Sequence, residues 1–184
     1  MADADGEQDW VMQSRNGNPA AFESLVRRHQ HMIHSLTYRM TGSLADAEDL
    51  AQETFIRAYR QLDTYQSASK FSTWLYRIAV NACLNWRRRE ARRAQIHATW
   101  SRSNEDGLSS INDSTDEMSR RVQKALMQLP AKQRAAIILT VYDEHNHAAA
   151  ARILGCSETT VSWRVFAARR KLKRLLSPAG GANG

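Results

Sequence analysis

The segment that decides the fold is residues 148–172, which read AAAARILGCSETTVSWRVFAARRKL. It predicts two short helices joined by Leu-Gly-Cys-Ser. This is the layout of a helix-turn-helix, whose second helix lies in the DNA major groove with its N-terminal half on base edges. Gly155 suits the turn because glycine takes a positive φ at no steric cost. Ser157 suits the N-cap of the second helix, since its hydroxyl can accept a free backbone N–H of the first turn.

The second of these helices has two different faces. Its apolar residues form one stripe that should face a core: Val161, Val165, Ala168, Leu172 and Leu175. Its other side carries Thr160, Trp163, Arg164, Ala167, Lys171 and Arg174. Such a face suits an anionic partner, although a plain surface helix with a solvated basic side is the other interpretation. The turn and the cap together favour the helix-turn-helix.

The charge of the chain is unevenly placed. Lys and Arg number 26 against 19 Asp and Glu, a formal net charge of +7. Residues 118–184 hold 12 basic and 3 acidic side chains, whereas residues 1–98 have a net charge of +2 and residues 99–117 a net charge of −4. Such an excess of basic side chains in a small module is typical of proteins that bind the phosphate backbone of nucleic acids.

Composition predicts an all-α protein of two small helical domains joined by a flexible linker. The chain has only 3 Pro and 8 Gly, and long segments have helical rather than alternating apolar spacing. Residues 99–117 are rich in Ser, Asn and Asp and predict the linker, while residues 1–8 and 177–184 should be frayed ends. The expected parts are therefore 1–98, 99–117, 118–178 and a disordered tail at 179–184. Nothing resembles a signal peptide or a membrane span, so we expect a cytoplasmic chain without membrane insertion.

An amphipathic helix is predicted within residues 46–62. Its apolar positions define a buried face: Ala47, Leu50, Ala51, Phe55, Ala58, Tyr59 and Leu62. Asp46, Asp49 and Glu53 share the opposite face, with Gln52 beside them. These carboxylates could serve only to complement the helix dipole. They could equally form a docking patch for a basic partner.

A second amphipathic helix is predicted within residues 71–93, after a small, polar, loop-like segment at 65–72. A polar stripe on its exposed face consists of Arg77, Asn81, Asn85 and Arg88, at spacings of three or four residues. Asn amides and Arg guanidinium groups suit base edges and phosphates. Core packing explains the aromatic residues of this helix but not the stripe. Aromatic and polar groups beside a basic helix are what unstacked single-stranded bases need.

Four segments together resemble a known family. DAEDLAQETFIRAY, KFSTWLYRIAVNACLNWRRR, LPAKQRAAIIL and ILGCSETTVSWRV, in this order and with an intervening linker, are similar to the extracytoplasmic-function (ECF) sigma factors of bacterial RNA polymerase. The resemblance covers nearly all of the chain except the tails and the linker. It implies a region-two domain and a region-four helix-turn-helix domain, which bind core polymerase, direct it to a promoter and open the DNA around the −10 element.

The resemblance also implies site residues and partners. The residues that match the helix binding the clamp helices of the polymerase β′ subunit are Asp46, Asp49, Gln52 and Glu53. Those that match the −10 loop and helix are Tyr65, Lys70, Phe71, Trp74, Arg77, Asn81, Asn85 and Arg88. Those that match the −35 recognition helix are Thr160, Ser162, Trp163, Arg164, Ala167, Arg170 and Lys171. Contacts with the β subunit and a sequestering anti-sigma factor are implied as well.

The chain departs from the family pattern near the helix-turn-helix. Family members often have Gly-Leu-Ser-Tyr before its first helix, whereas residues 144–147 here are Glu-His-Asn-His, and Trp163 replaces a small polar residue. The histidines at 29, 31, 34, 145 and 147 suggest a metal site, but no CxxC or HExxH spacing supports one. We interpret them as structural or surface histidines, and no metal, cofactor or enzymatic site is expected.

Two other functions fit parts of the pattern. A two-domain transcriptional regulator would use its N-terminal half to sense a ligand or to dimerise, but it would not need the polar stripe at residues 77–88. A regulatory decoy would keep the acidic patch and bind polymerase without opening promoters.

Overall fold

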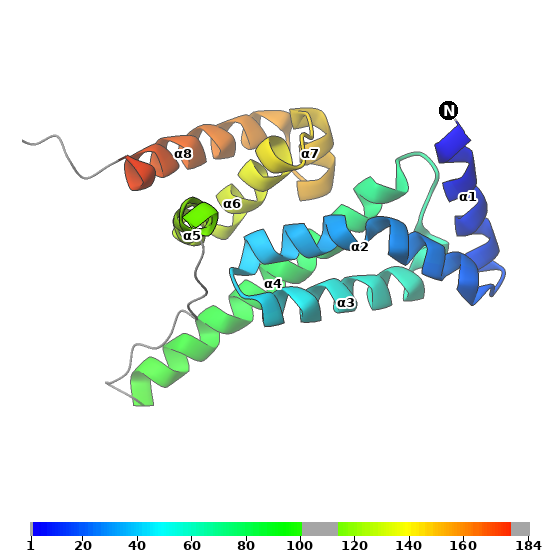
Figure 1. Cartoon of the computed structure of the whole chain (residues 1–184), viewed down its shortest axis with the longest axis horizontal. Helices are drawn as coiled ribbons and strands as arrows, with labels where there is room; N and C mark the ends of the chain where they lie inside the picture. The colour runs from blue at the N-terminus through cyan, green and yellow to red at the C-terminus, as the bar shows by residue number, and fades with distance from the viewer. Residues whose placement is uncertain (1, 101–113, 178–184) are drawn as a thin grey trace, which may run out of the picture. The chain divides into compact units, whose positions relative to one another are not determined.

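A computed structural model describes residues 2–100 and 114–177, and the regular elements within these residues are all helical, as predicted. The helices are, in chain order, α1 (Ala2–Arg15), α2 (Pro19–Thr41), α3 (Leu44–Arg60), the 3-10 turn η1 (Leu62–Thr64), α4 (Phe71–Trp100), α5 (Ser114–Met127), α6 (Ala131–Ile137), the π-helical turn η2 (Ile138–Tyr142), α7 (His147–Leu154) and α8 (Glu158–Leu176). They form two compact units (Figure 1). The first comprises α1 to α3, α4 as far as Cys83 and the short segment Arg152–Gly155, and the second comprises the rest of α4, α5, α6, the start of α7 and α8. No described helix is long and apolar enough to cross a membrane.

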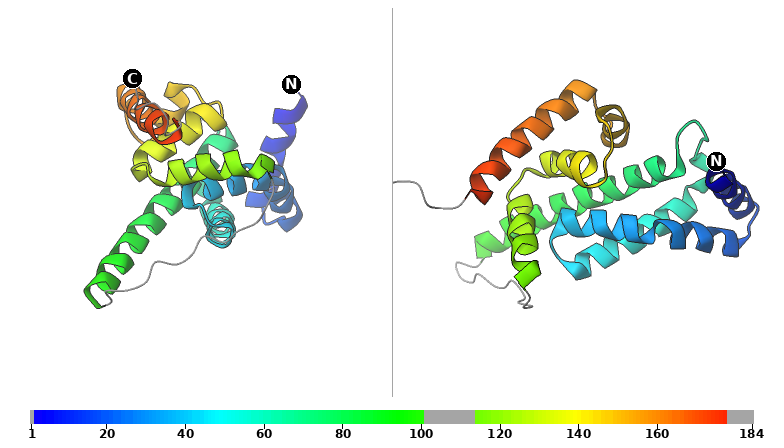
Figure 2. Two further views of the ribbon diagram at one scale, coloured as in Figure 1. Left: turned by 60° about the vertical axis from the view of Figure 1, so that its left-hand side comes forward. Right: turned by 45° about the horizontal axis from the view of Figure 1, so that its top comes forward.

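Helices α2 and α3 lie side by side as a hairpin (Figures 1 and 2). The Asn18 side chain caps α2 by accepting the N–H of Ala20 at 3.1 Å, and Pro19 suits the first helical position because it lacks an N–H. The hairpin turns at Gly42, whose φ of 76° favours glycine and whose N–H donates to Tyr38 O at 2.8 Å. The side chains buried in the hairpin include Leu25, Ile33, Leu36, Ala47, Leu50, Ala51 and Ala58.

Helix α1 corrects one prediction, since residues 2–8 belong to a helix and were expected to be frayed. It packs on α2 and buries Val11. The Glu7 carboxylate fixes it further, with Oε1 lying 2.8 Å from His29 Nε2 and 3.2 Å from Arg28 Nε. These partners are more than twenty residues away in the chain, so local sequence does not indicate them.

Helix α4 is longer and more buried than its sequence predicts. It extends past the predicted end at residue 93 to Trp100, and α5 already begins at Ser114, so both ends of the predicted linker are helical. The rest of that linker and the tail at 179–184 lie outside the described residues. The apolar face predicted for this helix consists of Phe71, Trp74, Leu75, Ile78, Ala79, Ala82 and Trp86. Tyr76, Val80 and Cys83, which lie outside that face, are buried as well. A single-stripe pattern could not predict this second buried side.

The second unit is organised around a buried arginine. Helices α5 and α6 both pack against α8, and Arg134 of α6 is only 1% exposed. Its guanidinium donates to the carbonyls of Leu126 at 2.8 Å, Met127 at 2.7 Å and Leu129 at 3.1 Å. The carbonyls of Leu126 and Met127 belong to the last turn of α5 and that of Leu129 follows the helix, so Arg134 binds the backbone around the end of α5.

Candidate nucleic-acid interface

The acidic face of α3 is exposed mainly at its centre. Asp49 and Gln52 are exposed, whereas Asp46 and Glu53 are half-buried. The Ser43 side chain caps the helix by accepting the N–H of Asp46 at 3.3 Å, and Glu53 pairs with Arg57 one turn on. Asp49 is therefore the most available carboxylate of the predicted set. Tyr59, which was predicted to be buried, is 51% exposed.

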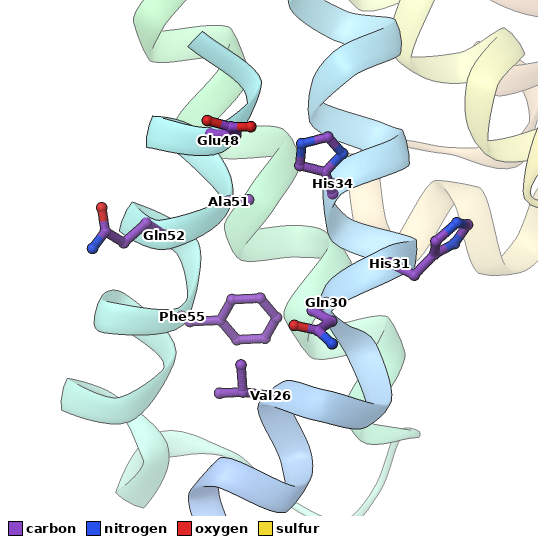
Figure 3. A pocket seen from close by; sticks show the side chains of 8 residues that line it. All are labelled: Val26, Gln30, His31, His34, Glu48, Ala51, Gln52 and Phe55. Atoms are coloured by element: carbon purple, nitrogen blue, oxygen red, sulfur yellow. The ribbon is translucent and has the colours of Figure 1, made fainter. Parts of the chain in front are cut away.

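Beside the acidic face, an open apolar groove runs between α2 and α3 (Figure 3). Its volume is about 430 Å³, and the Phe55 ring lies within it between the two helices. Its lining residues are Val26, Gln30, His31, His34, Glu48, Ala51, Gln52 and Phe55. The sequence did not predict this groove because it forms only when two helices pack together. It places apolar surface next to Gln52 and the exposed carboxylate of Glu48.

The predicted polar stripe of α4 is exposed along its whole length. Arg77, Asn81, Asn85 and Arg88 all point to solvent, while Leu75, Ala79 and Ala82 on the opposite side are buried. Arg88 Nη1 lies 3.5 Å from Asn85 Oδ1, which keeps these two side chains together. The stripe therefore offers amide and guanidinium groups to a ligand from one rigid helix.

Two of the residues expected at the DNA surface are instead buried beneath it. Tyr65 and Phe71 are each 2% exposed, and their ring centroids lie 5.4 Å apart in an edge-to-face contact. The half-buried Trp74 ring lies 5.5 Å from Tyr65, and the Tyr65 hydroxyl donates to Ser69 O at 2.7 Å. These rings support the loop at residues 65–70 from inside. Of the expected residues in this loop, Lys70 is exposed.

The predicted helix-turn-helix is confirmed in its turn and its cap. Gly155 takes a φ of 59°, and the Ser157 hydroxyl accepts the N–H of Thr160 at 3.2 Å. Helix α8 buries Val161 and Ala168. Its side chains thus divide into a buried stripe and an outer face, as the sequence predicts.

The outer face of α8 includes large aromatic side chains. Trp163 is 63% exposed and Phe166 is 65% exposed. Phe166 was not among the predicted residues, although its position three residues after Trp163 places it outside the core stripe. Ser162 and Arg170 are also exposed, whereas Thr160, Arg164, Ala167 and Lys171 are half-buried.

Four side chains of this face already have protein partners. Thr160 Oγ1 lies 2.8 Å from Ser157 Oγ. Ser162 Oγ lies 2.8 Å from His147 Nδ1 at the start of α7. Arg164 Nη1 lies 3.3 Å from Cys156 Sγ in the turn, and Lys171 Nζ donates to Gln128 O at 2.7 Å. Arg164 would have to exchange this weak thiol contact for a base edge to read DNA.

The histidines do not gather into a metal site within the described residues, where no group of three or more potential ligands is present. His29 is buried beside Phe71 and Glu7. Burial lowers the pKa of His29 below its ordinary value of 6.5, although the hydrogen bond and the charge of Glu7 oppose this shift. His147 instead contacts α8 through Ser162.

The lowered pKa of His29 predicts a loss of stability in mild acid. The unfolded chain takes up a proton near pH 6.5, while the folded chain resists it to a lower pH. Neutral His29 should therefore contribute fully to the free energy of unfolding above about pH 7. This contribution should be lost as the pH falls below about 6. Urea unfolding between about pH 5 and 7.5 measures this. A His29→Gln variant should show a flatter profile, and a stability that rises on acidification would contradict the prediction.

Two helical units, the second a helix-turn-helix with a basic outer helix, define a two-module DNA-binding protein. Family models match both modules: sigma-70 region 2 over residues 25–93 and sigma-70 region 4 over residues 119–172. The ECF RNA polymerase sigma factor SigM of Mycobacterium tuberculosis (strain H37Rv) is 36% identical over 162 residues, covering 87% of this chain and 79% of SigM. SigW of Bacillus subtilis (strain 168) is 34% identical over 176 residues, covering 90% of this chain and 94% of SigW.

Solved structures agree with these relatives. CnrH in complex with the cytosolic domain of CnrY superposes with a TM-score of 0.71 at 26% identity, over 95% of this chain and 99% of that one. The sigma factor RpoE in complex with the anti-sigma factor NepR from Bartonella quintana gives a TM-score of 0.70 at 27% identity, over 86% of this chain and 98% of that one. The chain belongs to the ECF sigma factors of bacterial RNA polymerase.

Proposed function

We propose that this chain binds core RNA polymerase, directs it to promoters through a −10 and a −35 element, and opens the DNA at the −10 element. The observation that carries the proposal is the exposed polar stripe of α4, which lies in the region-2 module of a chain that also has a region-4 helix-turn-helix. A ligand-sensing regulator would have no use for this stripe. The action would take place in the cytoplasm, where the polymerase works.

The polymerase-binding surface is assigned to α3. Asp49 and Gln52 are exposed, and the half-buried Asp46 and Glu53 flank them. Carboxylates on a rigid helix would pair with basic groups of the β′ clamp helices and set the orientation of docking. The apolar groove beside Phe55 would supply most of the affinity, since buried apolar contacts dominate binding energy in protein interfaces. Contacts with the β subunit are also proposed.

The −10 surface is assigned to α4 and to the loop before it. Arg77, Asn81, Asn85 and Arg88 would hold the non-template strand through base edges and phosphates. The loop at 65–70 would capture an unstacked base, with Lys70 and Trp74 beside it. Unstacking a base costs a few kcal/mol, which stacking and hydrogen bonds in the loop would offset. Tyr65 and Phe71 act here as internal supports of the loop, because both are buried.

The −35 surface is assigned to the outer face of α8. Its proposed members are Thr160, Ser162, Trp163, Arg164, Ala167, Arg170 and Lys171. Arg164 is the candidate for a base contact because arginine bonds the guanine O6 and N7 atoms in a bidentate manner. Arg170 and Lys171 are placed for phosphates, and Lys171 would first release Gln128 O.

Replacing Arg164 by alanine should weaken binding of the holoenzyme to its −35 duplex by about 1–3 kcal/mol if Arg164 reads a base. The loss should be confined to duplexes with the cognate base pair, which a panel of single-base-pair variants in a competition assay measures. Arg121→Ala removes an exposed arginine of α5 and is the matched control. A uniform loss across all duplexes would make Arg164 a phosphate contact instead.

An anti-sigma partner is proposed from the two similar structures, one of which is described as a complex with an anti-sigma factor. Free in solution, this chain exposes an apolar groove beside its carboxylates. A partner that covers the groove would block polymerase binding. Such a partner should therefore compete with core polymerase for this chain, and simultaneous binding of both would contradict the assignment.

Permanganate footprinting tests promoter opening by this chain. Thymines around the −10 element should become reactive only when core polymerase and this chain are both present, because permanganate oxidises unstacked thymine. A decoy would bind core polymerase and leave these thymines protected. The same footprint on a promoter with a substituted −10 element is the control.

A further inference from the structure

The loop at residues 65–70 is held by α1, an element that none of the assigned surfaces includes. Arg15, the last residue of α1, donates from Nε to Leu62 O at 3.2 Å and from Nη2 to the same oxygen at 3.0 Å. Its Nη2 also donates to Tyr65 O, and its guanidinium carbon lies 6.0 Å from the centre of the Tyr65 ring. One side chain thus binds the backbone at the point where the loop begins.

A second residue of α1 reaches further along the same loop. Ser67 Oγ donates to Gln8 Oε1 at 3.3 Å. Tyr65, held by Arg15, in turn donates from its hydroxyl to Ser69 O. Residues 62, 65, 67 and 69 are therefore each bonded, directly or through Tyr65, to α1, while Gln66, Ala68 and Lys70 remain exposed.

Helix α1 is itself fixed to α2, so the support is rigid. Glu7 is paired with His29 and Arg28 of α2, and Val11 and Ser14 are buried. A loop of small polar residues would otherwise have to be ordered when it captures a ligand, at a cost in backbone conformational entropy. A loop ordered in advance binds more tightly because that cost is met by folding.

We propose that Arg15 is a positioning residue for promoter opening, which fixes the loop at 65–70 in the conformation that captures an unstacked −10 base. The inference rests on the proposed function, since that function places the loop at the −10 element. Arg15 does not itself touch DNA in this account. It acts through the carbonyls of Leu62 and Tyr65, and Gln8 assists it through Ser67.

The test uses holoenzyme and a single-stranded non-template oligonucleotide covering the −10 element of a promoter that the wild type transcribes. A series of oligonucleotides, each with one abasic position, identifies the captured base as the position where wild-type binding drops. Arg15→Ala should bind the intact oligonucleotide about five- to tenfold more weakly, since it loses part of the affinity that capture of one base by stacking supplies. It should bind the oligonucleotide lacking the captured base as well as the wild type does.

Two variants serve as controls. Arg27→Ala removes an exposed arginine of α2 that pairs with the exposed Glu23 one turn away, so it should match the wild type on every oligonucleotide. Arg15→Lys keeps the charge but lacks the forked donors that bond two carbonyls, so it should bind at an intermediate level. Core polymerase affinity should be the same for all three variants. Should Arg15→Ala fail to fold, Arg15→Lys and Gln8→Ala can be compared with the wild type on the intact and the abasic oligonucleotides instead.

The outcomes separate the inference from the proposed function. Equal losses on the intact and the abasic oligonucleotides would mean that Arg15 only stabilises the fold, and this would overturn the inference. Wild-type affinity of Arg15→Ala for the intact oligonucleotide would overturn it as well. A wild-type holoenzyme that binds no −10 oligonucleotide would overturn the proposed function itself.

Discussion

Replacing Asp49 and Glu53 together by lysine is expected to lower the affinity for core polymerase by about 100-fold or more. Both carboxylates lie on the assigned docking face of α3, and reversing their sign would place like charges against the basic partner, which costs several kcal/mol. Asp49 is exposed and Glu53 pairs with the half-exposed Arg57 one turn on, so the hairpin core is untouched. Binding of labelled protein to core polymerase by fluorescence anisotropy measures the effect.

The matched control for this variant reverses two acidic residues elsewhere. Asp9 and Glu23 are exposed on α1 and α2, and each contacts a neighbour only one turn away along its own helix. The Asp9→Lys/Glu23→Lys variant should keep wild-type affinity, apart from a small change in salt dependence. Unchanged affinity of Asp49→Lys/Glu53→Lys, with an unaltered circular dichroism spectrum, would defeat the docking assignment.

Replacing Arg77, Asn81 and Asn85 by alanine is expected to reduce promoter opening by about 100-fold or more while leaving polymerase binding intact. Each of these exposed side chains is assigned a base-edge or phosphate contact, and one good base contact is worth about 1–3 kcal/mol. Their loss is additive where the contacts are independent. Permanganate reactivity of −10 thymines, together with core binding, measures the two effects separately.

A control for the α4 variant removes the same kinds of side chain elsewhere. Asn16 and Arg27 are exposed and lie outside all assigned surfaces, so their replacement by alanine should leave opening unchanged. A triple variant that opens the promoter at the wild-type rate would mean that the stripe serves only solubility.

The features that the sequence predicted well are those with local causes. The helix-turn-helix depends on a glycine at the turn and a serine at the next N-cap, and the structure has both in the predicted conformation. The polar stripe of α4 follows from helical periodicity, because the opposite side is apolar at the same spacing. The presence of these helices, and which of their faces is buried, could therefore be predicted from residue types and their spacing.

The features that the sequence could not predict depend on residues far apart in the chain. Arg15 bonds Leu62 across 47 residues, and Glu7 bonds His29 across 22. The groove beside Phe55 needs two packed helices. Tyr65 illustrates the limit for site residues: family resemblance places it in the DNA-binding loop, but only the packed structure gives its burial and hence its supporting role.

Run-off transcription tests the central claim most directly. Bacterial core polymerase would be supplied with the promoter region upstream of the gene for this chain, with and without the protein. The account predicts a transcript of defined length only when the protein is present, and its start site would locate both promoter elements. The Asp49→Lys/Glu53→Lys variant, added in place of the wild-type protein, should give no transcript. Failure of the wild-type protein to bind core polymerase in the same reaction would contradict the account.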